Sequence, residues 1–444
     1  MDRESKNRKD SLYLMVLGTA VFLLLGFALE QAAPVSTADF RLMYYSARCV
    51  LSGHDPYLEK NLRQTYREEG GETAQEGSIA QQTASQYIYL PTAFSVTIPF
   101  AVVPFALSQF LWLSLTAGST ILAAFLMWEV SVQWAPLAAG LLIAFTLANC
   151  ELLVAVAGPA GIAIGLCVIA AWCFIRERFE LLGVCLLSVS LILKPHDSGL
   201  VWLFFLLAGG VYRRRALQAL AAVVGLSIPS ITWTSYVAPH WTKEVLSSVA
   251  ANSAHGALND PGISSGAGHG IAMIISLQTM FSYFYDSPSF YNRASYLVCG
   301  CLLVVWMVRV FRISPRAEAA WLALAPVAAL SMLPVYHRLD DAKLLLLVIP
   351  ACSMLCARYR RLGNQALVVT AAQIVLTCAL PWALFFAVIK RMPPPGTEFG
   401  RQLLIAVQVM PAPVILLITA IFYLRMFIRS EQIGTVPNRE GGNL

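Results

Sequence analysis

The chain has 444 residues and a formal net charge of +6, yet only 13% of its residues are charged and its mean hydropathy is +0.65. Soluble domains carry about a quarter charged residues, so this composition excludes an ordinary soluble protein. The positive residues stand in short clusters between apolar runs, which is the orientation signal of membrane proteins. We therefore expect membrane lipids around the chain and no nucleic-acid partner.

The first predicted element follows a basic tail, residues 1–11. The apolar run Leu12–Leu29 is longer than the apolar region of most signal peptides. We interpret it as an uncleaved first span, with cleavage near Ala33 as the alternative. Because basic flanks stay in the cytoplasm, residues 31–87 are expected on the opposite, extracytoplasmic face.

Further apolar runs continue along the chain at the length that spans a bilayer, roughly 17 to 25 residues. Backbone amides in lipid must be satisfied within their own segment, so these runs predict helices. Residues 88–131 are expected to make one net crossing, with a short extra helix or a hairpin broken near Pro99–Pro104. Placing the basic clusters in the cytoplasm gives the remaining spans: 134–149, 152–174, 180–193, 195–210, 216–236, 293–309, 317–335, 342–357, 364–389 and 402–424.

The predicted fold is thus an all-α polytopic membrane protein with about twelve spans (11–13), in the cell (inner or plasma) membrane. Residues 12–429 form the membrane domain, and the tails 1–11 and 430–444 are cytoplasmic. The two large extracytoplasmic loops are 31–87 and 237–292. The histidines and most of the carboxylates at span ends gather on that outer face, so we expect the catalytic or binding site there.

Asp39 comes directly after the first span, with Tyr44 and Tyr45 close behind. A carboxylate shielded by rings at a membrane surface can have its pKa raised toward that of a working base. The alternative is a helix cap, since Ser36, Thr37 and Asp39 are all capping types.

Further along the same loop, Asp55 precedes a proline and follows Gly53, which favours a turn, although Asp55 could also face a sugar. The polar stretch 63–86 is expected to be a flap or a spacer. Tyr87 and Tyr89 return the chain to the membrane at a depth where tyrosines are common.

Three later polar breaks interrupt apolar sequence. Lys194, His196 and Asp197 surround a proline, and charged groups near a membrane usually have partners or a task. Lys194 could bind a phosphate as a point charge, or its ammonium could simply reach the interface. Glu151 forms a similar break between two predicted spans.

The third break is the run Tyr336–Lys343. Arg338 could pair with Asp340 or Asp341, or His337 and Arg338 could grip a phosphate leaving group, for which the arginine fork is suited. Asp340 and Asp341 could hold a divalent cation, but two adjacent acids without a third oxygen ligand in the sequence are weak evidence for such a site. The histidines of loop 237–292 fit no metal motif and the cysteines no disulfide framework, so no metal ion and no cofactor is expected.

Four stretches together resemble glycosyltransferase family 87, a branch of the GT-C superfold: "ADFRLMYYSARCVLSGHDPYL", "YIYLPTAFSVTIPFAVVPFALSQFLWLSL", "LILKPHDSGLVWLFFLLAGGVYRRR" and "YHRLDDAKLLLLVIP". The family includes mycobacterial mannosyltransferases of phosphatidylinositol mannosides. The resemblance implies a polyprenyl-phosphate sugar donor, an extracytoplasmic site, Asp39 as catalytic base and His337 as a second functional residue. The chain departs from the family at Asn149-Cys150-Glu151, where the family often shows Asn-Gly-Gln, and at His196-Asp197.

The expected reaction is transfer of a mannose-like hexose, with inversion, to a lipid or glycan acceptor. Lys194, His337 and Arg338 would stabilise the donor phosphate. The substrate-binding set is expected to comprise Tyr44, Tyr45, Asp55, Tyr87, Tyr89, Glu151, His196, Asp197, Asp340 and Asp341. The competing readings are a transporter or flippase of a lipid-linked sugar, for which no internal repeat is evident, and a non-catalytic scaffold.

Overall fold

The structure is a computed structural model that describes residues 3–32, 37–69, 87–257, 259–263, 274–312, 316–391 and 396–433. In these ranges every regular element is a helix, and strand pairing is limited to one antiparallel bridge between Ile274 and Arg338. The prediction of an all-α chain is confirmed for this part of the protein.

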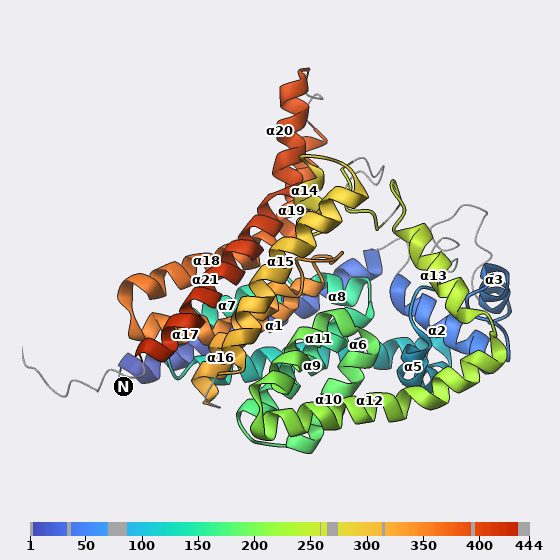
Figure 1. Cartoon of the computed structure of the whole chain (residues 1–444), viewed down its shortest axis with the longest axis horizontal. Helices are drawn as coiled ribbons and strands as arrows, with labels where there is room; N and C mark the ends of the chain where they lie inside the picture. Colours follow the sequence, from blue (N-terminus) through green and yellow to red (C-terminus); the bar gives the residue numbers. More distant parts are fainter. Residues whose placement is uncertain are drawn as a thin grey trace, which may run out of the picture.

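Figure 1 shows the order and arrangement of the helices. The first half contains α1 (Arg3–Ala32), α2 (Ala38–Leu51), α3 (Glu59–Glu68), η1 (Pro91–Ala93), α5 (Phe94–Ala101), α6 (Phe105–Ser131), α7 (Pro136–Ala148), α8 (Glu151–Ala155), α9 (Pro159–Ile175), α10 (Glu180–Leu193) and α11 (Pro195–Ala208). The second half contains α12 (Gly210–Val237), α13 (Trp241–Asn252), α14 (Leu277–Ser282), α15 (Pro288–Val310), α16 (Ala317–Leu330), η3 (Asp341–Leu347), α17 (Val348–Arg358), α18 (Arg360–Leu376), α19 (Ala379–Ile389), α20 (Glu398–Val409) and α21 (Pro411–Ile433).

Six of these segments are long and apolar enough to cross a membrane, or seven when the bent pair α18 and α19 is taken as one span. Three shorter apolar helices, α9, α10 and α16, accompany them. The chain is therefore a helical membrane protein. The sequence predicted one span over 364–389, but the two helices meet at an angle of 57°. Pro381 lies in the first turn of α19 and has no N–H to donate to the carbonyl of Thr377, so a helix that continued from α18 through this point would lose that hydrogen bond.

Two other predicted boundaries were wrong. The helix breaks at Asn149 and Cys150 as expected, but the apolar segment continues across this break from Pro136 to Ala155. A second break follows at Ala157 and Gly158, so the next long helix starts at Pro159 and not at the predicted residue 152. Ala157 adopts a left-handed φ of 53°, and Pro159 starts the next helix at a position where proline is favoured. The span expected at 402–424 divides at Pro411, so that the apolar segment is Pro411–Arg429 and α20 projects from the body of the molecule (Figure 1).

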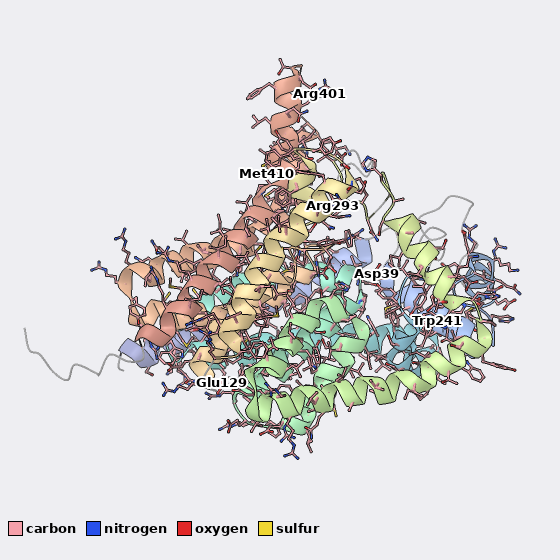
Figure 2. The ribbon with its side chains drawn as sticks, in the orientation of Figure 1. Asp39, Glu129, Trp241, Arg293, Arg401 and Met410 are labelled. Atoms are coloured by element: carbon pink, nitrogen blue, oxygen red, sulfur yellow. The ribbon has the colours of Figure 1, made fainter. Side chains whose placement is uncertain are left out.

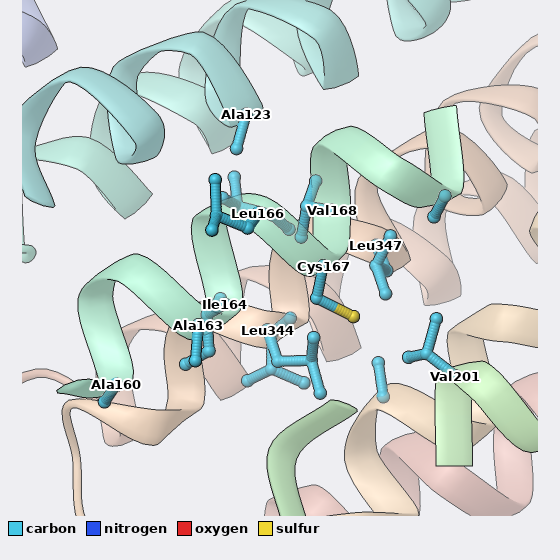
Figure 3. Close-up of a cluster of buried hydrophobic side chains, with 14 of the residues drawn as sticks. Ala123, Ala160, Ala163, Ile164, Leu166, Cys167, Val168, Val201, Leu344 and Leu347 are labelled. Atoms are coloured by element: carbon cyan, nitrogen blue, oxygen red, sulfur yellow. The ribbon is translucent and has the colours of Figure 1, made fainter. Parts of the chain in front are cut away.

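Helix α9 is the centre of the bundle. Every one of its residues, Pro159 to Ile175, is buried. Figure 3 shows its side chains between Ala123 of α6, Val201 of α11, and Leu344 and Leu347 of η3. A short helix shielded on all sides by protein need not present a lipid-facing surface, and its ends are fixed by its neighbours. The loops at those ends can therefore hold side chains in defined positions.

The first helix is held against α7 by residues without bulky side chains. A Cβ on Gly18 would lie 2.6 Å from the Cα of Ala144, and one on Gly140 would lie 2.7 Å from the Cα of Ser11. Such close backbone approach is typical of membrane helix pairs, where dispersion rather than the hydrophobic effect holds helices together. This contact fixes α1, and with it the position from which the chain continues to α2.

Candidate functional site

Asp39 lies beside the break between α8 and α9, where two backbone hydrogen bonds hold the start of α2. The backbone N–H of Thr37 donates to the carbonyl of Ala155 at 3.2 Å, and that of Asp39 donates to the carbonyl of Val156 at 3.3 Å. Gly158 leaves the space that the Asp39 carboxylate needs, because a Cβ there would lie 2.8 Å from its Oδ2. Figure 2 shows Asp39 within the body of the molecule, away from Arg401 on the projecting helix α20.

The Asp39 carboxylate is not a helix cap. The cap position of α2 is Thr37, with a left-handed φ of 51° and no side-chain cap bond. Within the described ranges the Asp39 side chain makes no hydrogen bond and no ion pair. Burial, followed by the nearby Asp340, raises the pKa of Asp39 to about 6, against the opposing effects of Arg338 and Lys194. It is thus a carboxylate held ready to accept a proton near neutral pH.

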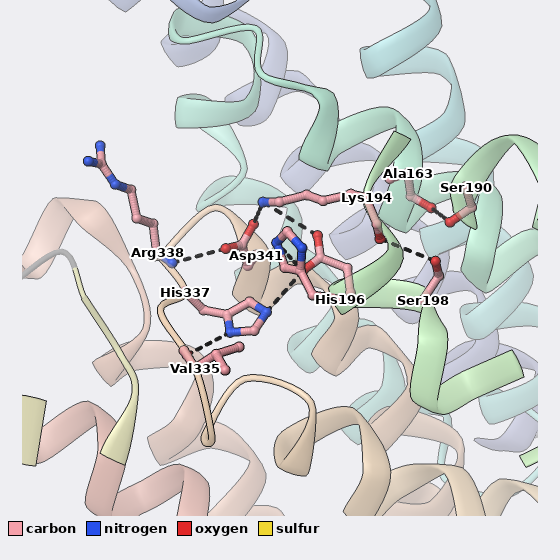
Figure 4. Close-up of polar contacts among 10 residues, drawn as sticks. Ala163, Ser190, Lys194, His196, Ser198, Val335, His337, Arg338 and Asp341 are labelled. Atoms are coloured by element: carbon pink, nitrogen blue, oxygen red, sulfur yellow. Dashed lines mark hydrogen bonds and ion pairs between the residues drawn. The ribbon is translucent and has the colours of Figure 1, made fainter. Parts of the chain in front are cut away.

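Lys194 links two segments of the site (Figure 4). It stands at the junction of α10 and α11, where Pro195 starts the second helix. Its ammonium contacts the Asp341 carboxylate and lies 3.5 Å from Oδ2 of Asp197, with all three side chains at most 14% exposed. Burial alone would lower the pKa of Lys194, but the two carboxylates raise it well above its usual value, so the ammonium stays charged.

The segment from Tyr336 to Asp341 lies opposite Lys194. Its turn is closed by the backbone N–H of Arg338, which donates to Oδ2 of Asp341 at 3.0 Å. The Arg338 guanidinium donates to the Tyr336 hydroxyl and, at 3.2 Å, to Oδ1 of Asn259. Burial and the neighbouring Asp341 raise the pKa of Asp340, which with Asp39 and Lys194 makes this a dense set of interacting charges.

Ile274 and Ile275, which precede α14, hold this segment in place. Ile274 forms its bridge with Arg338, and the backbone N–H of Ile275 donates to the carbonyl of His337 at 3.0 Å. Asn259 and Tyr336, which contact Arg338, were not among the predicted site residues, and neither was Gly158. Only Gly158 left a signal in the sequence: a Gly-Pro pair within apolar residues marks a break.

His337 and His196 both lie close to the carboxylate of Asp197. His337 is fully buried, and its Nδ1 lies 3.0 Å from the carbonyl oxygen of Val335. Its Nε2 lies 3.2 Å from Oδ1 of Asp197, and Nε2 of His196 lies 3.8 Å from the same oxygen. The two imidazole rings are 5.0 Å apart between centroids.

Several predicted substrate-binding residues have packing roles instead. The Tyr44 hydroxyl donates to the carbonyl of Val103 at 2.8 Å, and Tyr45 stacks on Phe105 with centroids 5.7 Å apart. Asp55 accepts a hydrogen bond of 2.9 Å from the backbone N–H of Tyr57, which confirms the predicted turn. These three residues are not brought into the cluster around Lys194.

The two interfacial tyrosines differ from each other. Tyr87 is fully buried and stacks on Phe94 with centroids 5.0 Å apart. Tyr89 belongs to the cluster, because its phenol is within electrostatic range of Asp39, Lys194 and Asp340. Of the pair, Tyr89 is the one whose phenol lies near these charges.

Glu151 is turned into the bundle. It is 3% exposed, and its Oε2 has no hydrogen-bond partner among the described residues. Lys343 is also buried. No ion pair or hydrogen bond within the described residues joins Glu151 to the residues around Lys194.

We name the residues gathered from α2, the segment before η1, the α10–α11 junction and the 336–341 segment the outer cluster: Asp39, Tyr89, Lys194, His196, Asp197, Tyr336, His337, Arg338, Asp340 and Asp341. It combines one carboxylate free to take a proton with two cations that can meet an anion. This combination suits a reaction in which a hydroxyl loses a proton while an anionic group departs. No protein-family model, no curated protein and no solved structure matches this chain.

Proposed function

We propose that the chain is a membrane glycosyltransferase that moves a hexose from a polyprenyl-phosphate sugar to a lipid or glycan acceptor on the extracytoplasmic face of the cell membrane. One observation carries the proposal: the Asp39 carboxylate, without a protein partner among the described residues, stands in the same cluster as Lys194 and Arg338. A base and an anion-binding pair are the two elements that sugar transfer from a phosphate requires.

In the proposed reaction Asp39 takes the proton of an acceptor hydroxyl. The acceptor oxygen forms a bond to the anomeric carbon from the face opposite the phosphate, and the bond from that carbon to the phosphate oxygen breaks with its electron pair. The configuration at the anomeric carbon is inverted. Lys194 and Arg338 face the lipid phosphate that leaves, and cations positioned where charge develops stabilise the transition state.

The proposal includes the crossing pattern of about twelve spans with both termini in the cytoplasm. It is supported by the short apolar helices α9, α10 and α16, which add to the six or seven longer candidates. Helices of 14 to 17 residues suffice at the centre of a bundle because their neighbours carry the contact with lipid. Protease protection in sealed vesicles, with tags at both termini, tests the orientation.

The function is tested by reconstitution. Purified full-length protein in liposomes is given a panel of radiolabelled polyprenyl-phosphate sugars together with extracted native lipids. We expect a new labelled glycolipid or glycan with at least one donor. Movement of the donor between leaflets without any product, from a protein that is folded, would contradict the proposal and indicate a flippase.

The rate of transfer should depend on pH through Asp39. Because burial raises the pKa of Asp39 to about 6, the carboxylate is a competent base above that pH and is protonated below it. We expect kcat/KM to rise with pH, with a midpoint near 6, and to level off above it. A profile that stays flat between pH 5 and 7, with protein shown to be folded throughout, would exclude Asp39 as the base.

Gly158→Ala should displace the base without unfolding the bundle. The new Cβ would lie 2.8 Å from Oδ2 of Asp39, so the carboxylate must move. Misplacement by about 1 Å can reduce a rate by up to about 100-fold, and we expect a loss of roughly tenfold to 100-fold in kcat. Gly199→Ala on α11 is the matched control, because a Cβ there meets no atom within 4 Å. Equal activity of the two variants would contradict the placement of Asp39.

A further inference from the structure

Three side chains of the outer cluster direct ligand atoms toward one point. His196, Asp197 and His337 each offer one ligand atom, and these atoms all lie within 4.8 Å of one another. The two shortest separations are 3.2 and 3.8 Å. Nitrogen and oxygen ligands of a tetrahedral zinc ion, at bond lengths of about 2.0–2.2 Å, lie roughly 3.3 Å apart. The separations between these ligand atoms are therefore close to those found around a single bound ion.

The same atoms lack hydrogen bonds. Nε2 of His337 and both carboxylate oxygens of Asp197 are buried without a hydrogen-bond partner in the part of the chain that the structure describes. Leaving a buried polar atom unpaired costs about 1–3 kcal/mol. Oδ2 of Asp197 lies 3.5 Å from the Lys194 ammonium, but Nε2 of His337 and Oδ1 of Asp197 face each other at 3.2 Å and require an explanation. In a neutral His337 whose Nδ1–H donates to the Val335 carbonyl, Nε2 presents a lone pair to the Asp197 carboxylate. Two facing lone pairs repel each other unless a cation lies between them.

Neighbouring groups orient the three side chains as a metal site requires. A metal-binding histidine usually donates its second ring nitrogen to a carbonyl or carboxylate, which fixes the tautomer and the ring plane. The Val335 carbonyl does this for His337. Asp197 is on the first turn of α11, and His196 precedes it directly, so Pro195 and the helix start place both residues together. His196 is 44% exposed and gives the point access from outside.

The charge of the outer cluster also favours a cation. It holds two more carboxylates than cations, since Lys194 and Arg338 face Asp39, Asp197, Asp340 and Asp341. A polyprenyl-phosphate donor is itself an anion, and an excess of negative charge would repel it. One divalent ion would offset the excess and leave Lys194 and Arg338 available to the phosphate.

We propose that His196, Asp197 and His337 form a binding site for one divalent transition-metal ion of the zinc class, with a coordination position left open. Two imidazoles and a carboxylate are a donor set that zinc accepts, and a fourth, open position is typical of catalytic sites. That an oxygen of the donor phosphate occupies this position rests on the proposed function; the metal site itself does not. The competing arrangement is a protonated His337 that contacts Asp197 directly, which needs no metal.

The test measures metal directly. Full-length protein in detergent is stripped with a chelator, exchanged into buffer with Zn²⁺, Mn²⁺ or Mg²⁺, and examined by elemental analysis and thermal unfolding. We expect one Zn²⁺ per chain and a saturable rise in Tm, with Mg²⁺ giving neither. His196→Gln removes a partly exposed ligand without opening the core, and it should weaken zinc binding at least tenfold. His54→Gln, an exposed histidine of the first extracytoplasmic segment, is the matched control and should bind like wild type.

Substoichiometric zinc in the wild type, or equal binding by wild type and His196→Gln, would overturn the metal site and favour the protonated His337. The outcome is separable from that of the proposed function. Stoichiometric zinc without any sugar transfer would leave the site standing and remove the transferase. If chelator-stripped protein transferred sugar at the wild-type rate and bound no added zinc, the transferase would stand and the metal site would be excluded.

Discussion

Asp39→Asn is expected to lower kcat for sugar transfer by roughly 10²–10⁴-fold, the contribution of a positioned general base. Asparagine has nearly the same shape as aspartate, so the space left by Gly158 and the backbone contacts of α2 with Ala155 and Val156 remain. What is removed is the ability to accept the hydroxyl proton. The loss should therefore appear in kcat with little change in donor binding.

The same substitution should leave the protein at least as stable as wild type. Because burial raises the pKa of Asp39 from 3.8 to about 6, the fold favours the protonated form, and the stability cost of the charged form develops as the pH rises through this range and is fully present above about pH 6. At pH 8 the neutral amide relieves that cost, so the Tm of Asp39→Asn should not fall. A variant that is inactive because it is unfolded would be recognised by its lowered Tm.

Asp55→Asn is the matched control for Asp39→Asn. It changes a carboxylate in the same segment between α1 and η1, but one that accepts a hydrogen bond in a turn, a role that an asparagine oxygen can also fill. We expect this variant to keep transferase activity within a few-fold of wild type. Equal rates for Asp39→Asn and Asp55→Asn, in a preparation that makes product, would refute Asp39 as the base.

The helices could be predicted from sequence where an apolar run ends at a proline. Helices α10 and α11, Glu180–Leu193 and Pro195–Ala208, nearly match the predicted segments 180–193 and 195–210, because Pro195 can start a helix but cannot continue one. Pro159 and Pro411 also start helices, and Pro381 lies in the first turn of α19, whereas the predicted spans ran through all three prolines. The prolines that mark these helix starts can be recognised from the local sequence alone.

The composition of the outer cluster could be predicted only in part. Charged groups beside apolar runs need partners, and this argument identified Lys194, Asp197 and the 337–341 segment correctly as a group of polar breaks that come together. It could not show which partner each would take, because the pairing of Lys194 with Asp341 depends on how α9 and η3 pack. Aromatic residues gave the weakest signal: Tyr44 and Tyr45 near a membrane surface look alike in sequence whether they face a sugar or pack on Phe105.

Lys194→Met should be the most destabilising single substitution in the outer cluster. Methionine keeps the apolar stem but removes the charge, which leaves Asp341 and Asp197 buried, at 3% and 2% exposure, without their cation. Breaking a buried ion pair from one side costs roughly 3–5 kcal/mol. Unfolding in one detergent, with a chelator present so that no added ion replaces the ammonium, should show this loss. Arg358→Met is the control, since its pair with Glu318 is exposed and worth at most about 1 kcal/mol.

The double variant Lys194→Met, Asp341→Asn separates the structural role of Lys194 from its proposed role toward the donor phosphate. Neutralising both partners removes the uncompensated charge, so most of the lost stability should return. Transferase activity should not return with it, because the cation that faces the leaving phosphate is still absent. If stability and activity recovered together, Lys194 would be a structural residue alone, and Arg338 would be the one remaining cation of the outer cluster that could meet the phosphate.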